Sequence, residues 1–303
     1  MVNILLIKLF NFSIYFNIFD ICLAARAISA IILFRNLKYD TMGNSLITIR
    51  GLRKSYGKGK ARNEVLKGID LDIHPGQIIG YIGPNGAGKS TTVKILCGIL
   101  PDFEGEISIF GKDLRTRSLE IKENIGYVPE TGALYDLLTP NEYLTFIGAL
   151  YRLDTEKLKS RIANLLSFFG MEKHADQRMD TFSKGMKQKI MIIAGMINNP
   201  DILFLDEPLS GLDANSVILV KELLIRLAKD GKTIFYCSHL MDVVEKISDR
   251  IILINNGIVM ADGTFEELRT EKADTLELLF AQLTGRQDTE VNTENLFNGL
   301  HKN

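Results

Sequence analysis

The chain has 303 residues, 46% of them hydrophobic and 24% charged, a composition typical of a globular protein with ample material for a core. Its 36 Lys and Arg side chains nearly balance 37 Asp and Glu, so the net charge is −1, and the basic excess of a dedicated nucleic-acid-binding protein is missing. The three cysteines lie in apolar segments and share no ligand spacing with the four histidines, so we expect neither a disulfide framework nor a zinc site.

Residues 1–41 differ in composition from the rest of the chain, because they are rich in Ile, Leu and Phe but interrupted by charged side chains. The longest uncharged runs, 9–19 and 27–34, are too short for a helix that crosses a hydrocarbon core about 30 Å thick. A secretory signal is not expected either, because its positively charged start is missing. Three interpretations stay open: translation that begins at Met42, an amphipathic segment on a membrane surface, and a helix that binds a partner.

Strands are predicted where apolar residues alternate with polar ones or form short β-branched runs. Residues 47–50 are the first predicted strand, 51–64 are predicted to form a polar, Gly-rich loop, and 65–82 contain two strands with a turn at Pro75-Gly76. The remaining predictions are a strand and turn in 105–114, buried strands in 125–130, 201–208 and 232–239, and a hairpin in 249–263 that turns at Asn256-Gly257.

Helical patterns alternate with these strands. One follows Gly88, and another begins at Pro140 with Thr139 as its cap. Together with the amphipathic segment 153–171, the second pattern predicts a helical lobe over about 134–182. Further helices are predicted in 182–197, in a segment that ends at Gly231 and in 276–285, whereas the polar residues 286–303 are expected to be disordered.

The run 83–90, Gly-Pro-Asn-Gly-Ala-Gly-Lys-Ser, matches the phosphate-binding loop pattern G-x-x-x-x-G-K-S. It lies between an apolar, β-branched run and a helical pattern, which is the strand–loop–helix context that this loop requires. Its glycines permit a tight turn whose backbone N–H groups point at a phosphate chain. Lys89 is expected to reach the β- and γ-phosphates and the Ser90 hydroxyl to bind Mg²⁺. The sequence therefore predicts nucleotide binding.

The Asp206-Glu207 pair and His239 point to the same phosphate site, and Tyr56 is a candidate contact for the adenine. Asp206 and Glu207 end a buried strand, where adjacent charges need a partner; Mg²⁺ is such a partner for Asp206, and Glu207 is then available to polarise water. His239 ends the next strand and has two interpretations, a contact with the γ-phosphate or the attacking water, and a structural histidine. Tyr56 is either an exposed tyrosine or a ring that stacks on adenine.

These segments resemble the nucleotide-binding subunit of an ATP-binding cassette (ABC) transporter, and the resemblance covers about 46–265. The resemblance implies an α/β fold: a RecA-like P-loop NTPase core with an N-terminal antiparallel β-subdomain, an inserted α-helical subdomain over about 134–182, and a C-terminal helix and polar tail over 266–303. The matching motifs are the adenine-stacking aromatic at Tyr56; the Walker A loop at Gly83, Pro84, Asn85, Gly86, Ala87, Gly88, Lys89, Ser90 and Thr91; the Q-loop at Glu130; the signature at Phe182, Ser183, Lys184, Gly185 and Met186; the Walker B strand Ile202 to Asp206 with the catalytic Glu207; the D-loop at Ser210, Gly211, Leu212 and Asp213; and the switch histidine at His239.

The motifs depart from the family pattern at three positions. Glu130 stands where the family commonly has glutamine, and Lys184 and Met186 replace a glycine and a glutamine of the signature. Ser183 and Gly185 remain, and in the family these residues face the γ-phosphate of the opposite subunit. The S-K-G-M signature, together with IGYVPE, resembles the ABC-2-type branch, whose members are generally exporters.

The resemblance implies an ATPase that binds ATP and Mg²⁺, the metal being held by Ser90 and Asp206. The expected partners are a separate transmembrane permease and a second nucleotide-binding subunit, identical or different, and no nucleic acid. The expected location is the cytoplasmic face of the cell membrane. Residues 130–145, with Tyr135 and Tyr143, are interpreted either as the contact with the permease or as core of the helical lobe.

Two alternatives belong to other functional classes. A soluble ABC ATPase that acts on ribosomes or DNA usually carries long coiled-coil insertions or two cassettes in one chain, and this sequence has neither. A small-molecule P-loop kinase would not need Ser183 and Gly185 or the loop from Ser210 to Asp213. The transported substrate is not encoded in these motifs, because the membrane subunits select it.

Overall fold

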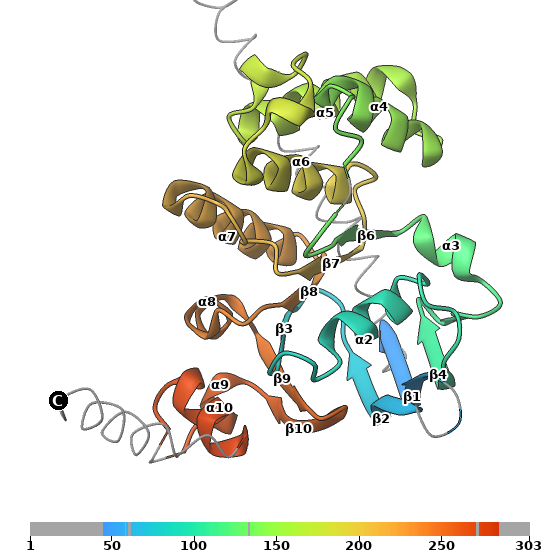
Figure 1. The fold of residues 1–303 in the computed structure, drawn as a ribbon, viewed down its shortest axis with the longest axis vertical. Helices are drawn as coiled ribbons and strands as arrows, with labels where there is room; N and C mark the ends of the chain where they lie inside the picture. The colour runs from blue at the N-terminus through green and yellow to red at the C-terminus, as the bar shows by residue number, and fades with distance from the viewer. Residues whose placement is uncertain (1–44, 58, 60–61, 133, 271–272, 285–303) are drawn as a thin grey trace, which may run out of the picture. The chain divides into compact units, whose positions relative to one another are not determined.

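The structure is a computed structural model (Figure 1). The chain divides into two units, residues 1–44 and 45–303. The structure describes residues 45–57, 59, 62–132, 134–270 and 273–284. The expectations for 1–41 and for the tail 286–303 lie outside these residues, so the following description concerns the second unit. Within the described part of the chain, no helix combines the length and apolar character that crossing a bilayer requires.

The first sheet is antiparallel and has the strand order β2-β1-β4-β5. Its strands are β1 (Ile47–Tyr56), β2 (Asn63–Ile73), β4 (Glu104–Ile109) and β5 (Lys112–Asp113). Strand β1 pairs with a neighbour on each side, and its side chains Ile47, Ile49 and Leu52 are fully buried. The predicted N-terminal antiparallel subdomain is confirmed.

The predicted loop over 51–64 is wrong, because β1 continues to Tyr56 and β2 already begins at Asn63. Register shifts between Ile49 and Leu52 and again after Lys54 let the polar strand bend while it stays paired. Leu52 to Tyr56 pair with β2, and Arg53 pairs with β4 as well, so strand pairing overrides the local preference of these residues for a loop.

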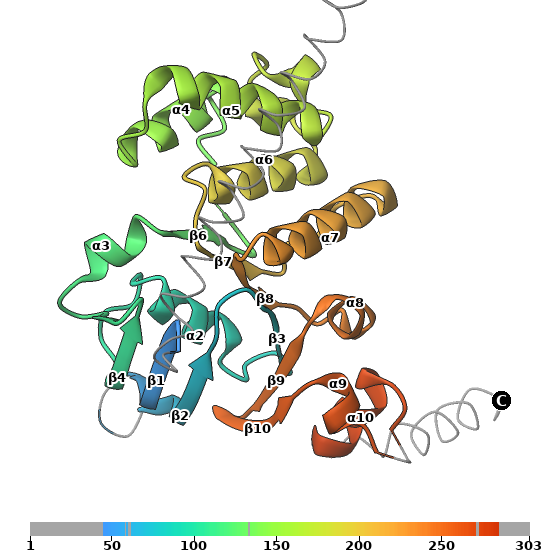
Figure 2. The same cartoon turned by 180° about the vertical axis from the view of Figure 1, so that it is seen from behind.

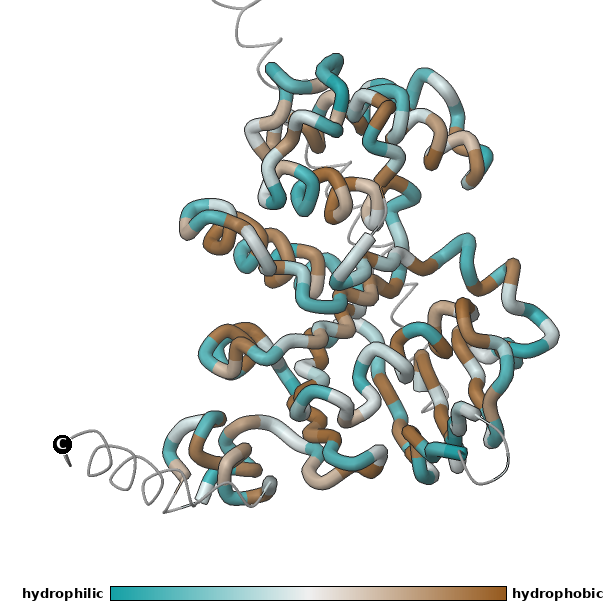
Figure 3. The backbone as a smooth tube through the Cα atoms, in the orientation of Figure 1, coloured by the Kyte–Doolittle hydropathy of each residue, from teal (hydrophilic) through white to brown (hydrophobic). Residues whose placement is uncertain are grey.

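The second sheet has the order β10-β9-β3-β8-β7-β6, and its strands run parallel except for β10. The strands are β3 (Ile78–Ile82), β6 (Ile125–Val128), β7 (Ile202–Asp206), β8 (Thr233–Cys237), β9 (Arg250–Asn255) and β10 (Ile258–Gly263). Every residue of β3, β7 and β8 is buried, as expected for parallel strands with both faces covered. Figure 3 shows the hydrophobic residues gathered along the strands.

Helices cover both faces of the parallel sheet: α2 lies on one side, and α7 and α8 lie on the other (Figures 1 and 2). Besides α2 (Lys89–Leu96) and α7 (Ala214–Lys229), the structure contains α3 (Ser118–Lys122), α8 (Met241–Ile247), α9 (Phe265–Leu268) and α10 (Leu276–Thr284). Sequence patterns did not predict α3, α8 and α9, which are only one or two turns long. A short helix carries too few residues for a clear period.

Between β6 and β7 the chain forms only helices and turns, apart from the undescribed residue 133. The elements are α4 (Pro140–Leu150), α5 (Thr155–Phe168), the 3₁₀ turns η2 (Glu172–His174) and η3 (Met179–Thr181), and α6 (Lys184–Met196). The predicted start of α4 is confirmed: Thr139 accepts from Glu142 N–H, and the Glu142 side chain accepts from Thr139 N–H.

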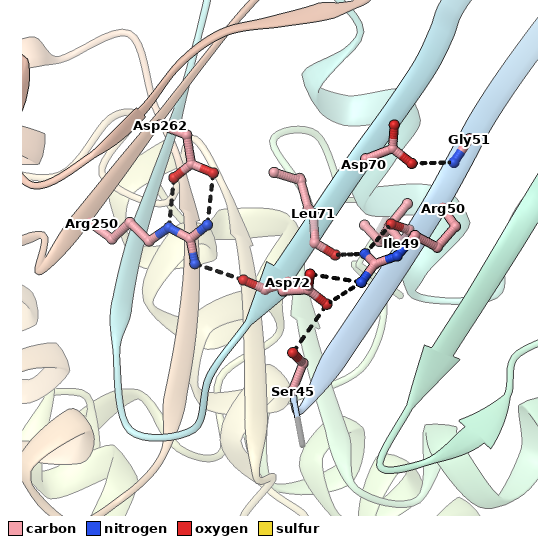
Figure 4. Close-up of polar contacts among 9 residues, drawn as sticks. All are labelled: Ser45, Ile49, Arg50, Gly51, Asp70, Leu71, Asp72, Arg250 and Asp262. Atoms are coloured by element: carbon pink, nitrogen blue, oxygen red, sulfur yellow. Dashed lines mark hydrogen bonds and ion pairs between the residues drawn. The ribbon is translucent and has the colours of Figure 1, made fainter. Parts of the chain in front are cut away.

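A hydrogen bond from Arg250 of β9 to the Asp72 carbonyl of β2 joins the two sheets, with an ion pair on either side of it (Figure 4). Arg250 donates to both carboxylate oxygens of Asp262, at 2.6 and 2.7 Å, and to the Asp72 carbonyl at 2.6 Å. Partial burial of the Asp72 carboxyl is outweighed by hydrogen bonds from Arg50 and Ser45, which hold its pKa below the usual value. The β9–β10 hairpin is therefore fixed against the antiparallel sheet.

The tip of this hairpin also supports the phosphate loop. The predicted turn at Asn256-Gly257 is confirmed, with φ angles of 47° and 79° and strands that pair directly on either side. Gly257 N–H donates to the Ala87 carbonyl at 3.1 Å, and the Gly257 carbonyl accepts from Lys67 N–H at 2.9 Å. The turn thus links β2 to the loop that follows β3.

Candidate functional site

One pocket of about 870 Å³ brings together most of the residues predicted to bind and hydrolyse a nucleotide. The carboxyl ends of the parallel strands β3, β7 and β8 meet at one edge of the sheet, so the loops that follow them converge there. The lining residues are Asn63, Val65, Gly83, Pro84, Asn85, Gly86, Gly88, Lys89, Ser90, Thr91, Glu130, Asp206, Glu207, His239, Met241 and Phe280.

Backbone conformation shapes the phosphate loop. Gly86 and Gly88 have φ angles of 81° and 109°, which side chains of L-residues rarely allow. A Cβ on Gly88 would lie 2.5 Å from Leu66 Cδ2, whereas a Cβ on Gly86 would meet no atom within 4 Å. The backbone at Gly86 is therefore open to a ligand. Ala87, in the middle of the loop, is buried and does not line the pocket. Its carbonyl oxygen accepts from Gly257 N–H and so attaches the loop to the tip of the hairpin.

Lys89 supplies the positive charge of the loop. Its side chain is buried, and its ammonium group donates to the carbonyl oxygens of Gly83 at 2.6 Å and Pro84 at 3.2 Å. Lys89 is also the first residue of α2, whose first turn contains no acidic side chain. The ammonium group and the free N–H groups of the helix start both favour an anion at this position.

Asp206 is only 2% exposed and lies among other acids. Burial raises the pKa of its carboxyl, a hydrogen bond from the Ser90 hydroxyl opposes this, and the negative charges of Glu130 and Glu207 raise the pKa further. The described residues contain no group of three or more His, Cys, Asp or Glu side chains able to hold a metal. One carboxylate and one hydroxyl nevertheless fit Mg²⁺, which commonly takes its remaining oxygen ligands from phosphates and water.

Glu207 is held in one orientation by its neighbours. Its φ of 48° is unusual for a residue other than glycine, and its N–H donates to the Cys237 carbonyl at 2.9 Å. One carboxylate oxygen lies 2.8 Å from His239 Nδ1, and the other accepts from Ser238 Oγ at 3.0 Å. The His239 side chain is 65% exposed. The structure therefore brings the predicted residues Glu207 and His239 into contact and adds Ser238, which sequence reasoning missed. In the sequence, only its position next to His239 could have indicated that Ser238 belongs to the site.

Tyr56 does not line the pocket. It is exposed at the end of β1, directly opposite Asn63 of β2, which does line the pocket. Lys54 Nζ lies 5.2 Å from the centroid of the Tyr56 ring. The stacking of adenine on Tyr56 stays a prediction.

The signature and the D-loop contact each other but not the pocket of their own chain. Ser183 caps α6 by accepting from Met186 N–H at 3.2 Å, and Lys184 Nζ donates to Ser210 Oγ at 3.0 Å. A Cβ on Gly185 would lie 2.7 Å from the Gly211 carbonyl, so the two segments pack backbone to backbone. Asp213, after Leu212, caps α7 by accepting from Ser216 N–H at 3.0 Å.

Replacing Asp206 by Asn is expected to raise the melting temperature of the nucleotide-free protein at neutral pH without Mg²⁺. The folded-state pKa of Asp206 is raised, so its contribution to stability is present at low pH and is lost as the pH rises above the ordinary value of 3.8 towards the folded value. Asparagine is neutral at every pH, so the variant carries no buried negative charge at this position at neutral pH. Thermal unfolding followed by circular dichroism measures this effect.

The control is Asp113→Asn, because hydrogen bonds from Thr116 lower the pKa of the exposed Asp113 carboxyl. This variant should gain no stability at neutral pH. A lower melting temperature for Asp206→Asn than for the parent protein would contradict the expectation that the buried charge of Asp206 destabilises the folded state.

Comparisons with known proteins agree with this geometry. A family model described as ABC transporter matches residues 66–210. The chain is 35% identical over 238 residues to the ABC transporter ATP-binding protein NatA of Bacillus subtilis, a match that covers 78% of this chain and 96% of NatA. It is 37% identical over 223 residues to the linearmycin resistance ATP-binding protein LnrL of Bacillus subtilis, covering 74% and 70% of the two chains.

Solved structures show the same likeness. One, described as the ATP-binding subunit of an ABC transporter, has 31% sequence identity and a TM-score of 0.72, and the match covers 79% of this chain and all of that chain. Another is a dimeric ATP-binding cassette in a post-hydrolysis state with ADP and Pi bound. It has 27% identity and a TM-score of 0.67, with 72% of this chain and 98% of that chain covered.

Proposed function

Because the chain belongs to the ABC transporter family, we propose that it is the ATP-hydrolysing subunit of a membrane transporter. One observation carries this proposal: the phosphate loop, Asp206 and the Glu207–His239 pair, which are remote in sequence, line one pocket. Glu207, which contacts His239, lines this pocket together with the phosphate loop, and this supports a role as the group that accepts a proton during hydrolysis.

Different residues of the pocket have different roles in ATP binding and hydrolysis. Lys89 and the N–H groups of the loop bind the triphosphate. Gly86 has no side chain, and the space beside its backbone is open to the triphosphate. Ser90 and Asp206 are the residues that would hold Mg²⁺, whose charge offsets that of the phosphates. Glu207 polarises the attacking water, and His239 keeps the Glu207 carboxylate in place.

A second nucleotide-binding subunit completes the site in this proposal. Ser183 and Gly185 lie at the start of α6 and outside the pocket of their own chain, so they are available to a nucleotide on a facing subunit. Two such contacts related by a twofold axis would join the subunits through their nucleotides. The solved cassette with ADP and Pi bound is dimeric, which supports a second subunit in this proposal.

A groove beside the helical segment is the proposed contact for the membrane-spanning partner. It has a volume of about 500 Å³ and is lined by Tyr127, Leu134, Tyr143, Ile147, Leu150 and Met191, among others. Tyr143 is half-buried in its wall, whereas Tyr135 is 61% exposed and packs against the Phe146 ring with centroids 5.9 Å apart. An exposed aromatic cluster next to an apolar groove favours a partner contact over a lobe core.

The direction of transport is proposed to be export. The S-K-G-M signature resembles that of the ABC-2-type branch, and the similar protein LnrL is named for resistance to linearmycin. With a membrane-spanning partner, the subunit would work at the cytoplasmic face of the membrane, where ATP is available.

Purification of the tagged chain from detergent-solubilised membranes tests the proposal. We expect an integral membrane protein to co-purify and to be identified by mass spectrometry. Leu150→Asp, which puts a charge into the groove, should abolish this association, whereas Ile218→Asp on the exposed side of α7 should not. Recovery of ribosomes or DNA without a membrane protein would instead support the soluble alternative.

A further inference from the structure

The C-terminal helix α10 reaches the nucleotide pocket through Phe280. This residue lies far beyond the catalytic motifs and outside the segment 66–210 that matches the family model. Phe280 is an aromatic side chain in the wall of a pocket that is otherwise rich in backbone polar groups and charges. The role of this helix goes beyond the motifs that define the proposed function.

Helix α10 is firmly attached to the body of the protein. Leu276 and Leu279 are buried in the core, and Leu276 N–H donates to a carboxylate oxygen of Glu245 in α8 at 2.9 Å. Figures 1 and 2 show α10 at the same end of the molecule as α8 and α9. Leu278 is 47% exposed, so the helix has one anchored face and one free face. Phe280 lies at the border of the anchored face, half-buried and beside the pocket.

The helix against which α10 packs begins just after the switch histidine. Helix α8 begins at Met241, two residues after His239, and the buried Met241 also lines the pocket. His239 itself is largely exposed and is held through its contact with Glu207. Leu240 alone separates His239 from Met241, so the seating of α8 also constrains the position of His239, and α10 packs against α8.

We propose that Phe280 is a positioning residue of the nucleotide site. It lines, together with Met241 at the start of α8, the pocket that also holds the Glu207–His239 pair, and its ring there keeps the start of α8, and with it His239, in position. The inference rests on the proposed ATPase function. Loss of the ring would open this part of the pocket to water and allow the start of α8 to shift, and small displacements of catalytic groups cost much of the rate. The phosphate loop lies on other elements, so ATP binding should persist.

Three substitutions in the full chain test the role of Phe280. Phe280→Ala should lower kcat for ATP hydrolysis by about tenfold, with the dissociation constant for ATP changed by less than about twofold, and Phe280→Leu should restore most of the rate. Leu278→Ala, on the exposed face of the same helix, should behave like the parent protein. Phosphate release gives kcat, and isothermal titration calorimetry gives the ATP affinity.

Leu279→Ala distinguishes a specific effect of Phe280 on the position of the catalytic residues from a general loss of protein stability. Leu279 is only 4% exposed and does not line the pocket, so its truncation should lower the melting temperature more than Phe280→Ala but reduce kcat less. If the loss of kcat followed the loss of melting temperature across all four variants, or if Phe280→Ala turned over at the parent rate, the positioning role would be wrong. A parent protein that released no phosphate would instead contradict the proposed function itself.

Discussion

Replacing Glu207 by Gln is expected to stop ATP hydrolysis while leaving ATP binding intact. Glutamine has nearly the same shape and can still accept the hydrogen bond from Ser238, so the local structure should survive. It has no negative charge, however, and cannot take a proton from the attacking water. General base catalysis contributes about 10²- to 10⁴-fold, and we expect the steady-state rate of phosphate release to fall by a factor in this range.

The same variant should accumulate a dimer. If hydrolysis is what separates two subunits joined by ATP, then blocking it leaves the dimer as the stable species, visible by size-exclusion chromatography with ATP but not without it. Glu120→Gln is a suitable control, because Glu120 is an exposed partner of Arg117 and Lys112. Hydrolysis by Glu207→Gln at the parent rate would mean that another group polarises the water.

Replacing Lys89 by Ala is expected to remove most of the affinity for ATP. Hydrogen bonds to charged groups contribute about 1.5 to 3 kcal/mol each, so losing the ammonium group should weaken binding by roughly 10- to 150-fold. In the structure this group donates to the Gly83 and Pro84 carbonyls. Isothermal titration calorimetry with ATP measures the loss, and phosphate release should fall with it.

Lys94→Ala provides the matched control for this prediction. Lys94 lies in the last turn of the same helix α2, is exposed and does not line the pocket. Its removal should leave both affinity and hydrolysis close to the parent values. Because Lys89 is buried, circular dichroism must show that Lys89→Ala is folded. A folded variant with near-normal turnover would refute the role of the phosphate loop.

Features encoded in short contiguous runs were predicted from sequence. The phosphate loop, the carboxylates at the end of β7 and the turn at Asn256-Gly257 each depend on residues that are neighbours in the chain. The physical reasons are local. Glycines permit a left-handed backbone, and charged residues at the end of a buried parallel strand lie at the edge of the sheet where ligands bind. The sequence by itself therefore determined the fold class, the family and most residues of the pocket.

The tertiary structure decided the features that depend on distant partners. The pairing of β1 with β2 and β4 extended a strand through a segment of loop-like composition. Ser238 acquired a role only through its hydrogen bond to Glu207, and Phe280 entered the pocket only because α10 packs against α8. Strand pairing and helix packing are contacts between segments far apart in the chain, and no local pattern of residues records which segments will meet.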